Sequence, residues 1–240
     1  GSRGRSAVVS LASVRSRIAA ACARAGRDPS EVTLVGVSKG HDADEVRRTL
    51  IDGGLLDLGE NRVQEWRDKA AALPREVRWH FVGSLQRNKV KYLADGGVTC
   101  VHSLNSARLA DAMQAQGEKR QHTFRALIEV DVAGEERKQG LPPEELEALL
   151  THCRPLDRVE VVGLMAMAPF SDDPEDARPH FRRLRELADA YGLPERSMGM
   201  SGDFEVAIEE GATLVRVGTA LFEPDDADDA SAPGEEGGHP

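Results

Sequence analysis

Eight short apolar runs alternate with seven helical patterns between residues 32 and 217, and this alternation constrains the fold more than any other feature. The runs that resemble buried strands are Val32–Ser38, Leu55–Leu58, Val77–Val82, Val98–His102, Arg125–Val132, Val159–Met165, Ser197–Met200 and Thr213–Val217. The helical patterns are Asp44–Asp52, Arg62–Ala71, Gln86–Ala94, Ser106–Gln116, Pro143–His152, Glu175–Tyr191 and Phe204–Glu210. Such alternation predicts parallel βαβ units, which an open doubly wound sheet and a closed (β/α)8 barrel both contain. Eight repeats without a break into halves favour a single-domain α/β barrel of the TIM type.

Two segments flank this pattern. An additional N-terminal helix is predicted because apolar residues follow helical spacing at Leu11, Val14, Ile18 and Cys22. From Glu223 onward the chain has seven acids and no Lys or Arg, so the net charge of −10 falls to near −3 without this tail. We therefore expect a barrel over residues 7–222 and an acidic, disordered tail over residues 223–240. Neither part has the basic face that nucleic-acid binding requires.

The cysteines indicate the compartment. Cys22, Cys100 and Cys153 are odd in number and far apart, without the spacing of metal ligands or of a disulfide framework. Reduced thiols predict a cytoplasmic protein with no metal site. No apolar stretch approaches the ~20 residues that cross a bilayer, so we expect no membrane partner.

A barrel places its functional groups at the carboxyl ends of the strands. Lys39 ends the first strand, where a lysine is commonly a solvated cap but, if buried and neutral, reacts with aldehydes. Asn61 follows the second strand and either binds a ligand or caps the next helix. His80 lies within the third strand, where a core histidine is the simpler interpretation.

The last two strands end in glycine-bearing turns. Ser201 follows the seventh strand, and Gly218 and Thr219 follow the eighth, where barrels often bind phosphate, although helix capping is the alternative. Arg216 shares a strand face with Gly218 and needs a partner, either a carboxylate such as Asp203 or Glu205, or a ligand acceptor such as a pyridine nitrogen. An aldehyde and a phosphate on one small molecule suggest pyridoxal phosphate.

Several segments together resemble the pyridoxal phosphate homeostasis protein family, whose members resemble the N-terminal barrel of alanine racemase. The similar segments are Leu34–Lys39, Gly59–Glu65, Trp79–Lys89, Gly163–Met167, Ser197–Ser201 and Arg216–Ala220. The resemblance extends in order from about Val9 to Phe222. Departures from the common family pattern at Gly40-His41-Asp42, Ser84 and Gly202 concern loop rigidity and cofactor exchange more than binding.

The resemblance implies a role for individual residues. Pyridoxal 5'-phosphate (PLP) is expected as a Schiff base on Lys39, with its phosphate near Ser201, Gly218 and Thr219 and its ring nitrogen near Arg216. Lys138 matches a family lysine implicated in handling the cofactor. Asn61 and His80 complete the candidate cofactor-binding set. The implied role is intracellular vitamin B6 homeostasis, with PLP-dependent apo-enzymes as partners and a monomer or weak dimer as the assembly.

Three functions remain open at this point: a PLP-binding protein without substrate turnover, an amino-acid racemase, and a sugar-phosphate enzyme with a Schiff-base lysine. Racemisation needs bases on both faces of the imine and an electron sink. The two tyrosines, Tyr92 and Tyr191, lie in predicted helices away from the strand ends. An arginine at the ring nitrogen leaves that nitrogen unprotonated and the ring a poor sink. We therefore expect a binding protein with no catalytic residues.

Overall fold

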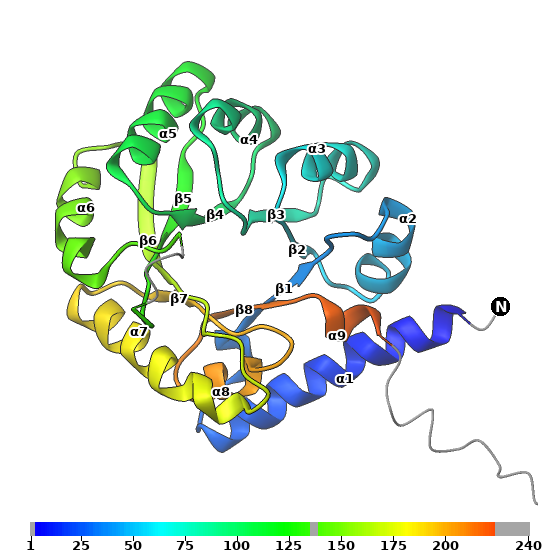
Figure 1. Cartoon of the computed structure of the whole chain (residues 1–240). Helices are drawn as coiled ribbons and strands as arrows, with labels where there is room; N and C mark the ends of the chain where they lie inside the picture. Colours follow the sequence, from blue (N-terminus) through cyan, green and yellow to red (C-terminus); the bar gives the residue numbers. More distant parts are fainter. Residues whose placement is uncertain (1–2, 135–138, 224–240) are drawn as a thin grey trace, which may run out of the picture.

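The computed structural model describes residues 3–134 and 139–223 and contains a closed parallel barrel with strands in sequential order (Figure 1). Its strands are β1 Thr33–Val37, β2 Asp57–Glu60, β3 Arg78–Phe81, β4 Cys100–Leu104, β5 Phe124–Glu129, β6 Val159–Met165, β7 Glu195–Ser197 and β8 Leu214–Val217. The pairing of β1 with β8, which aligns Val35 with Arg216, closes the barrel. The predicted fold class is therefore confirmed.

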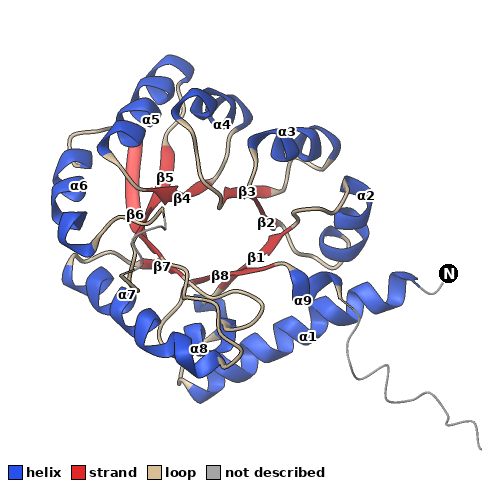
Figure 2. Ribbon diagram, viewed as in Figure 1, coloured by secondary structure: helices blue, strands red, loops and turns tan. Residues whose placement is uncertain are grey.

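Helices surround the strands on the outside (Figure 2). They are α1 Arg3–Arg24, α2 Ala43–Val46, α3 Val63–Ala72, α4 Val90–Gly96, α5 Ala107–Arg120, α6 Leu146–Cys153, α7 Arg178–Ala190, α8 Phe204–Glu209 and α9 Thr219–Phe222. A π-helical turn at Arg47–Ile51 extends α2 and completes the predicted helix there. The additional N-terminal helix α1 packs against α8 and α9 outside the barrel.

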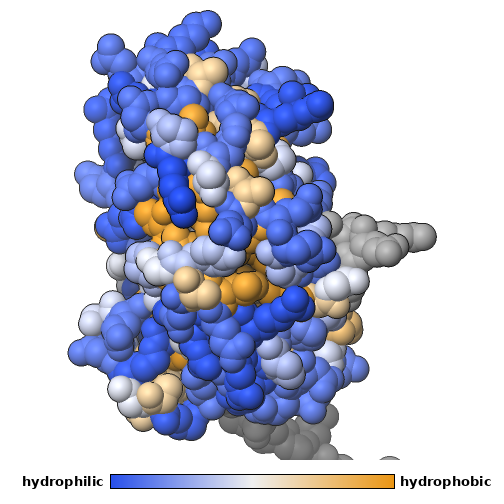
Figure 3. All heavy atoms as spheres, turned by 90° about the vertical axis from the view of Figure 1, so that its left-hand side faces the viewer, coloured by the Kyte–Doolittle hydropathy of each residue, from blue (hydrophilic) through white to orange (hydrophobic). Residues whose placement is uncertain are grey.

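Two apolar layers hold the barrel together. The larger fills the space between strands and helices and includes the fully buried Phe81, Phe124, Phe181 and Phe204. The smaller lies inside the barrel and consists of Val35, Cys100, Leu127, Val162, Met165 and Leu214. The face drawn in Figure 3 is mainly hydrophilic, with apolar side chains visible in its central part. Burial on both faces explains the nearly continuous apolar runs of the strands.

The strand boundaries differ from the predictions by two residues or more at β2, β4, β5 and β7. β4 is Cys100–Leu104 rather than 98–102, and β5 ends at Glu129 rather than Val132. β2 begins two residues later than predicted, because Leu55 and Leu56 precede the strand while Asp57 and Glu60 belong to it. β7 comes earlier, at Glu195–Ser197, because Gly199 has a φ of +101° that ends the extended backbone. The short helix α9 was not predicted.

The structure describes some of the residues on which the composition-based expectations depend, but not all of them. Cys22, Cys100 and Cys153 are buried free thiols. Within the described part of the chain, no helix combines the length and apolar content that spanning a membrane demands. The predictions for Lys138 and for nearly all of the 223–240 tail lie outside the described residues.

Candidate functional site

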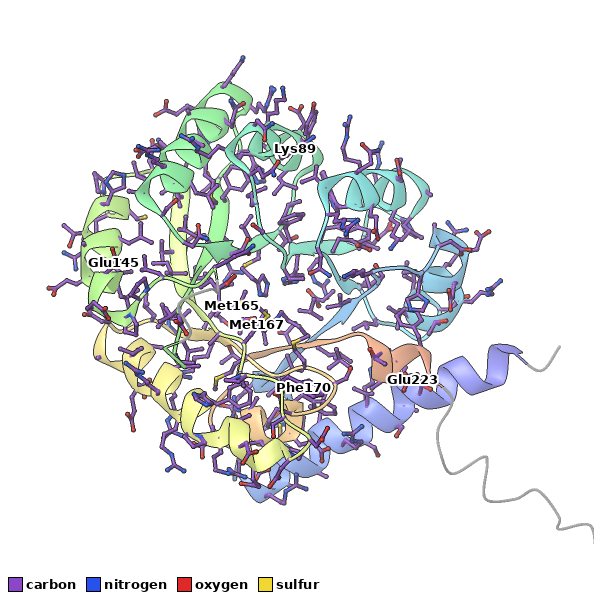
Figure 4. The ribbon with its side chains drawn as sticks, in the orientation of Figure 1. Lys89, Glu145, Met165, Met167, Phe170 and Glu223 are labelled. Carbon is purple, nitrogen blue, oxygen red and sulfur yellow. The ribbon has the colours of Figure 1, made fainter. Side chains whose placement is uncertain are left out.

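A cavity of about 740 Å³ opens at the carboxyl ends of the strands. Six of the seven predicted cofactor-binding residues line it: Lys39, Asn61, Ser201, Arg216, Gly218 and Thr219. Met167 and Phe170, from the segment after β6, also line it and lie over the barrel mouth (Figure 4). A smaller hollow of about 490 Å³ lies at the amino ends of β5 to β7 and contains none of the predicted residues. Barrel topology thus gathers residues from both ends of the sequence around one cavity.

Lys39 reaches the cavity from a tight turn after β1. Gly40 adopts a φ of +79°, and the His41 N–H donates to the Ser38 carbonyl over 3.1 Å. The Lys39 side chain is exposed, so the condition that it be buried is not met, although the residue lines the cavity. Lys69 of α3 is a buried lysine and donates to the Ser38 carbonyl over 2.6 Å. Lys69 therefore supports the Lys39 turn from below.

The turns after β7 and β8 are tied to each other. The Ala220 N–H, in the first turn of α9, donates to Ser201 Oγ over 3.1 Å, whereas the N-cap of the following helix α8 is Asp203. Ser201 also lines the cavity, together with Gly218 and Thr219 at the start of α9. A Cβ added to Gly218 would lie 3.2 Å from the Val37 carbonyl oxygen, so the backbone passes close to the end of β1. Both turns can present backbone N–H groups and hydroxyls to a phosphate.

Arg216 forms the floor of the cavity and is only 3% exposed. One terminal nitrogen donates to Ser197 Oγ over 2.6 Å and the other to the Ala166 carbonyl over 3.2 Å. Burial lowers the pKa of Arg216 to about 10, against the opposing effect of Glu129 and Asp203. At neutral pH this side chain is a cationic donor facing the cavity.

The predicted carboxylate partners of Arg216 do not hydrogen-bond to it. Asp203 accepts the Met200 N–H over 2.8 Å, and Glu205 pairs with Arg17 of α1 over 2.7 Å. Desolvation raises the pKa of the Glu129 carboxyl, and the positive charge of Arg216 opposes that rise. Arg216 is thus anchored by a hydroxyl and a carbonyl, and of the two alternatives the carboxylate partner does not fit the structure.

Asn61 and His80 have different positions. Asn61 lines the cavity, and its backbone passes so close to the next loop that a Cβ at Gly83 would lie 2.2 Å from the Asn61 carbonyl oxygen. The N-cap of α3 is Arg62, so Asn61 is not that cap. His80 is 4% exposed and does not line the cavity; it bonds to Asp57 and His102 inside the barrel. The core-histidine interpretation of His80 therefore fits the structure.

The ligand atoms of His80, Cys100 and His102 lie within 4.8 Å of one another. Both ring nitrogens of each histidine are already engaged in hydrogen bonds within the protein. Burial raises the pKa of the Cys100 thiol to about 12, which disfavours the thiolate that binds metal ions. The group is better described as part of a buried hydrogen-bond chain than as a metal site.

Several cavity residues were not assigned to the site from the sequence. The His41 ring stacks on Phe222 with centroids 3.7 Å apart and planes at 9°, and its Nδ1 lies 2.9 Å from Glu45 Oε2. Phe222 belongs to the unpredicted helix α9, so this contact had no local signal. The exposed Met167 and Phe170 follow β6 in a segment with no helical or strand periodicity.

Known proteins share this arrangement. A family profile described as alanine racemase, N-terminal domain, matches residues 9–225. A pyridoxal phosphate homeostasis protein from Aquifex aeolicus is 49% identical over 219 residues, covering 88% of this chain and 95% of the relative. The protein of that name from Escherichia coli K12 is 37% identical over 225 residues, covering 88% and 94%.

Solved structures agree with the sequence comparison. PipY of Synechococcus elongatus with PLP bound superposes with a TM-score of 0.79 at 32% identity, covering 90% of this chain and all of that chain. An alanine racemase from Clostridium difficile superposes with a TM-score of 0.71 at 15% identity, covering 94% of this chain and 58% of the racemase. At that identity the likeness to the racemase concerns the fold alone.

Proposed function

Since the chain belongs to the pyridoxal phosphate homeostasis protein family, we propose that it binds PLP in the cavity at the carboxyl ends of its strands. The observation that carries the proposal is the convergence of a lysine, two anion-binding turns and a buried arginine on one cavity. The implied role is to hold PLP reversibly within the intracellular vitamin B6 pool and to make it available to apo-enzymes that need it.

The donor set fits the chemical groups of PLP. When bound, PLP supplies an aldehyde that condenses with a primary amine to give a Schiff base and water. Lys39 offers that amine at the cavity, and the turns at Ser201 and Gly218–Thr219 offer N–H and hydroxyl donors to the phosphate. Arg216 offers its guanidinium to the ring nitrogen, and Asn61 offers an amide at the same cavity. His80 supports this set from inside the barrel without lining the cavity.

Two features favour binding without substrate turnover. Arginine does not give up its proton readily, so it leaves a ring nitrogen unprotonated and weakens the ring as an electron sink. Tyr92 packs with Arg67 on the outer helices, and Tyr191 borders the hollow at the opposite end of the barrel, so neither tyrosine lines the cavity. Among the described residues, no tyrosine is therefore placed at the cavity to act as a base for racemisation.

A spectroscopic experiment tests the binding proposal. We expect purified protein incubated with PLP to give an imine absorbance band, and borohydride to trap the cofactor on the peptide that contains Lys39. Lys39→Ala should abolish the band, whereas Lys89→Ala, which alters an exposed lysine outside the cavity, should retain it. Absence of a band in the wild type, or trapping on another lysine, would refute the proposal.

The non-enzymatic role has its own test. PLP-loaded protein is incubated with L-alanine, and D-alanine is measured over time. We expect no sustained production of D-alanine, and repeated turnover would show a racemase. A parallel assay follows activation of a PLP-dependent apo-enzyme by the loaded protein, where no activation would refute the proposed transfer.

The domain boundaries form a further part of the proposal. We assign PLP binding to residues 7–222, because every residue assigned here to the PLP groups lies within them. A chain that ends at Phe222 should bind PLP with the affinity of the full chain. A large loss of affinity would assign the acidic segment 223–240 to the binding unit.

A further inference from the structure

A chain of side-chain hydrogen bonds crosses the barrel interior and ends at Arg216. It consists of Asp57, His80, His102, Ser197 and Arg216, and we call it the His–Ser chain. His80 Nε2 lies 3.0 Å from Asp57 Oδ1, and His80 Nδ1 lies 2.9 Å from His102 Nε2. His102 Nδ1 lies 2.8 Å from Ser197 Oγ, which accepts from Arg216 over 2.6 Å.

The chain takes one residue from each of five strands: β2, β3, β4, β7 and β8. Because β4 and β7 are not neighbours in the barrel, the bond between His102 and Ser197 runs through the interior rather than along the sheet. His80, His102, Ser197 and Arg216 are all at most 4% exposed. At the far end, Asp57 also pairs with the exposed Arg78 over 2.8 Å. The chain therefore joins the amino end of the barrel to the cavity.

The chemistry of its two ends fixes the direction of the two outer bonds. Arg216 has no acceptor, so it can only donate to Ser197. Burial alone would raise the pKa of Asp57, but hydrogen bonds from His80 and Arg78 outweigh this effect and hold it at about 2. Asp57 is therefore an anion that can only accept, and His80 Nε2 carries the hydrogen.

The middle of the chain then depends on the hydrogens of His80. When His80 carries its only hydrogen on Nε2, it accepts at Nδ1 and His102 donates from Nε2. Burial lowers the pKa of His102 well below 6.5, and the positive charge of Arg216 opposes its protonation further, so His102 is neutral and in this arrangement accepts at Nδ1. The Ser197 hydroxyl then donates to His102, and all four bonds run in one direction, from Arg216 to Asp57.

We propose that Asp57, His80, His102 and Ser197 are positioning residues that hold the Arg216 guanidinium in one orientation toward the ligand in the cavity. The inference rests on the proposed function for the identity of that ligand, PLP, but the arrangement of hydrogens exists in the protein alone. Ser197 and the Ala166 carbonyl fix two nitrogens of Arg216 from separate elements. The charged groups near the cavity end, Glu129 and Asp203, act on Arg216 without a hydrogen bond to it.

The first test reads the histidine hydrogens by ¹⁵N NMR of the cofactor-free protein at pH 7.5. We expect His80 and His102 both as neutral Nε2–H tautomers. Asp57→Leu removes the acceptor that sets the direction, so His102 should populate the Nδ1–H tautomer although it does not touch residue 57. An imidazolium at His80, Nδ1–H tautomers in the wild type, or an unchanged His102 signal in a folded Asp57→Leu variant would overturn the inference.

The second test reads the effect on the ligand. Ser197→Ala removes one anchor of Arg216, and we expect PLP affinity to fall about tenfold, as the loss of one hydrogen bond to a charged group predicts. The matched control is Ser103→Ala, since Ser103 is a buried strand serine whose Oγ has no partner among the described residues. It should bind PLP as the wild type does.

The outcomes separate this inference from the proposed function. If the wild type does not bind PLP, the proposed function fails, while the NMR result still decides the direction of the chain. If the wild type binds PLP and a folded Ser197→Ala variant binds it equally well, the positioning role fails and the proposed function stands. If Ser103→Ala weakens binding as much as Ser197→Ala does, the effect is general to the interior and the positioning role also fails.

Discussion

The cavity rests on two buried polar networks that differ in their charge. Beneath Lys39, the Lys69 cluster consists of Ser38, Glu60 and Lys69, with Lys69 Nζ 2.5 Å from Glu60 Oε1 and Ser38 Oγ also donating to that oxygen. Glu60 is fully buried, and its Oε2 has no partner in the described part of the chain. Beneath Arg216, the His–Ser chain has the uncharged His102 and Ser197 at its centre. One network is a compact ion pair, and the other is an extended chain whose charged ends, Asp57 and Arg216, are separated by three side chains.

This difference predicts how each network fails. An ion pair in a low-dielectric layer depends on both partners, because removing one leaves an uncompensated buried charge. A chain of neutral groups loses one hydrogen bond at a time, and the remaining hydroxyl or imidazole can reorient. Substitutions in the Lys69 cluster should therefore have the larger effect on the free energy of unfolding. Substitutions in the His–Ser chain should mainly change the orientation of Arg216 and the affinity for the ligand.

The largest expected effect is on the Lys69 cluster. Lys69→Met leaves Glu60 charged and buried, so the free energy of unfolding should fall by about 3–5 kcal/mol. Lys69→Met combined with Glu60→Gln should recover most of that loss. Urea denaturation measures both. The control is Lys91→Met on α4, where we expect a change within about 0.5 kcal/mol.

Two results would contradict this picture of the Lys69 cluster. One is a loss of less than about 1 kcal/mol in the free energy of unfolding of Lys69→Met, well short of the roughly 3–5 kcal/mol expected when a buried ion pair loses one partner. The other is a double variant no more stable than the single one. Either would mean that Glu60 is already neutral in the folded protein and that the two networks do not differ in charge.

A smaller effect is expected in the His–Ser chain. His102→Leu removes two hydrogen bonds but no charge, and the free energy of unfolding at pH 7.5 should fall by about 2 kcal/mol. Urea denaturation beside Lys69→Met compares the two networks directly. A loss in His102→Leu larger than that in Lys69→Met would reverse their order.

The pH dependence of stability gives a third comparison. His102 is neutral in the folded protein because burial lowers its pKa and the positive charge of Arg216 lowers it further, whereas the unfolded chain binds a proton there near pH 6.5. Below that pH the unfolded state thus binds more protons than the folded state. The free energy of unfolding should therefore fall by up to about 1.4 kcal/mol for each unit by which the pH is lowered. The groups that face His102 are His80, Ser197 and Cys100 in addition to Arg216.

The matching measurement follows urea denaturation of the wild type and His102→Gln from pH 7.5 to 5.5. The stability difference between the two proteins should change across this range, in favour of the variant at low pH. A constant difference would show that His102 binds its proton equally in the folded and unfolded states.

The sequence predicted the rim of the cavity better than the interior beneath it. Lys39, Gly218 and Thr219 lie within two residues of a strand end and Ser201 within four, and parallel topology alone brings the carboxyl ends of strands together. The shift of β2 had a local cause, since Leu55 and Leu56 continue the apolar pattern outside the strand. Periodicity identifies which segments are strands but not where polar residues enter them.

The two networks had no comparable signal. His102 and Ser197 are 95 residues apart, and their contact depends on the register and closure of the whole barrel. Lys69 and Glu60 are nine residues apart, but one lies on a strand and the other on a helix, so neither periodicity aligns them. Polar residues in such positions resemble solvated ones until packing fixes their neighbours.

The smallest expected effect lies where the His–Ser chain meets the solvent. Arg78 pairs with Asp57, but its side chain is 54% exposed. Exposed ion pairs contribute little, so Arg78→Ala should lower the free energy of unfolding by less than about 1 kcal/mol. It should also leave both histidine tautomers unchanged, because Asp57 remains an anion through its bond to His80. A loss as large as that of His102→Leu, or a changed His102 tautomer, would mean that the charge that sets the direction of the chain is the Asp57–Arg78 pair rather than Asp57 alone.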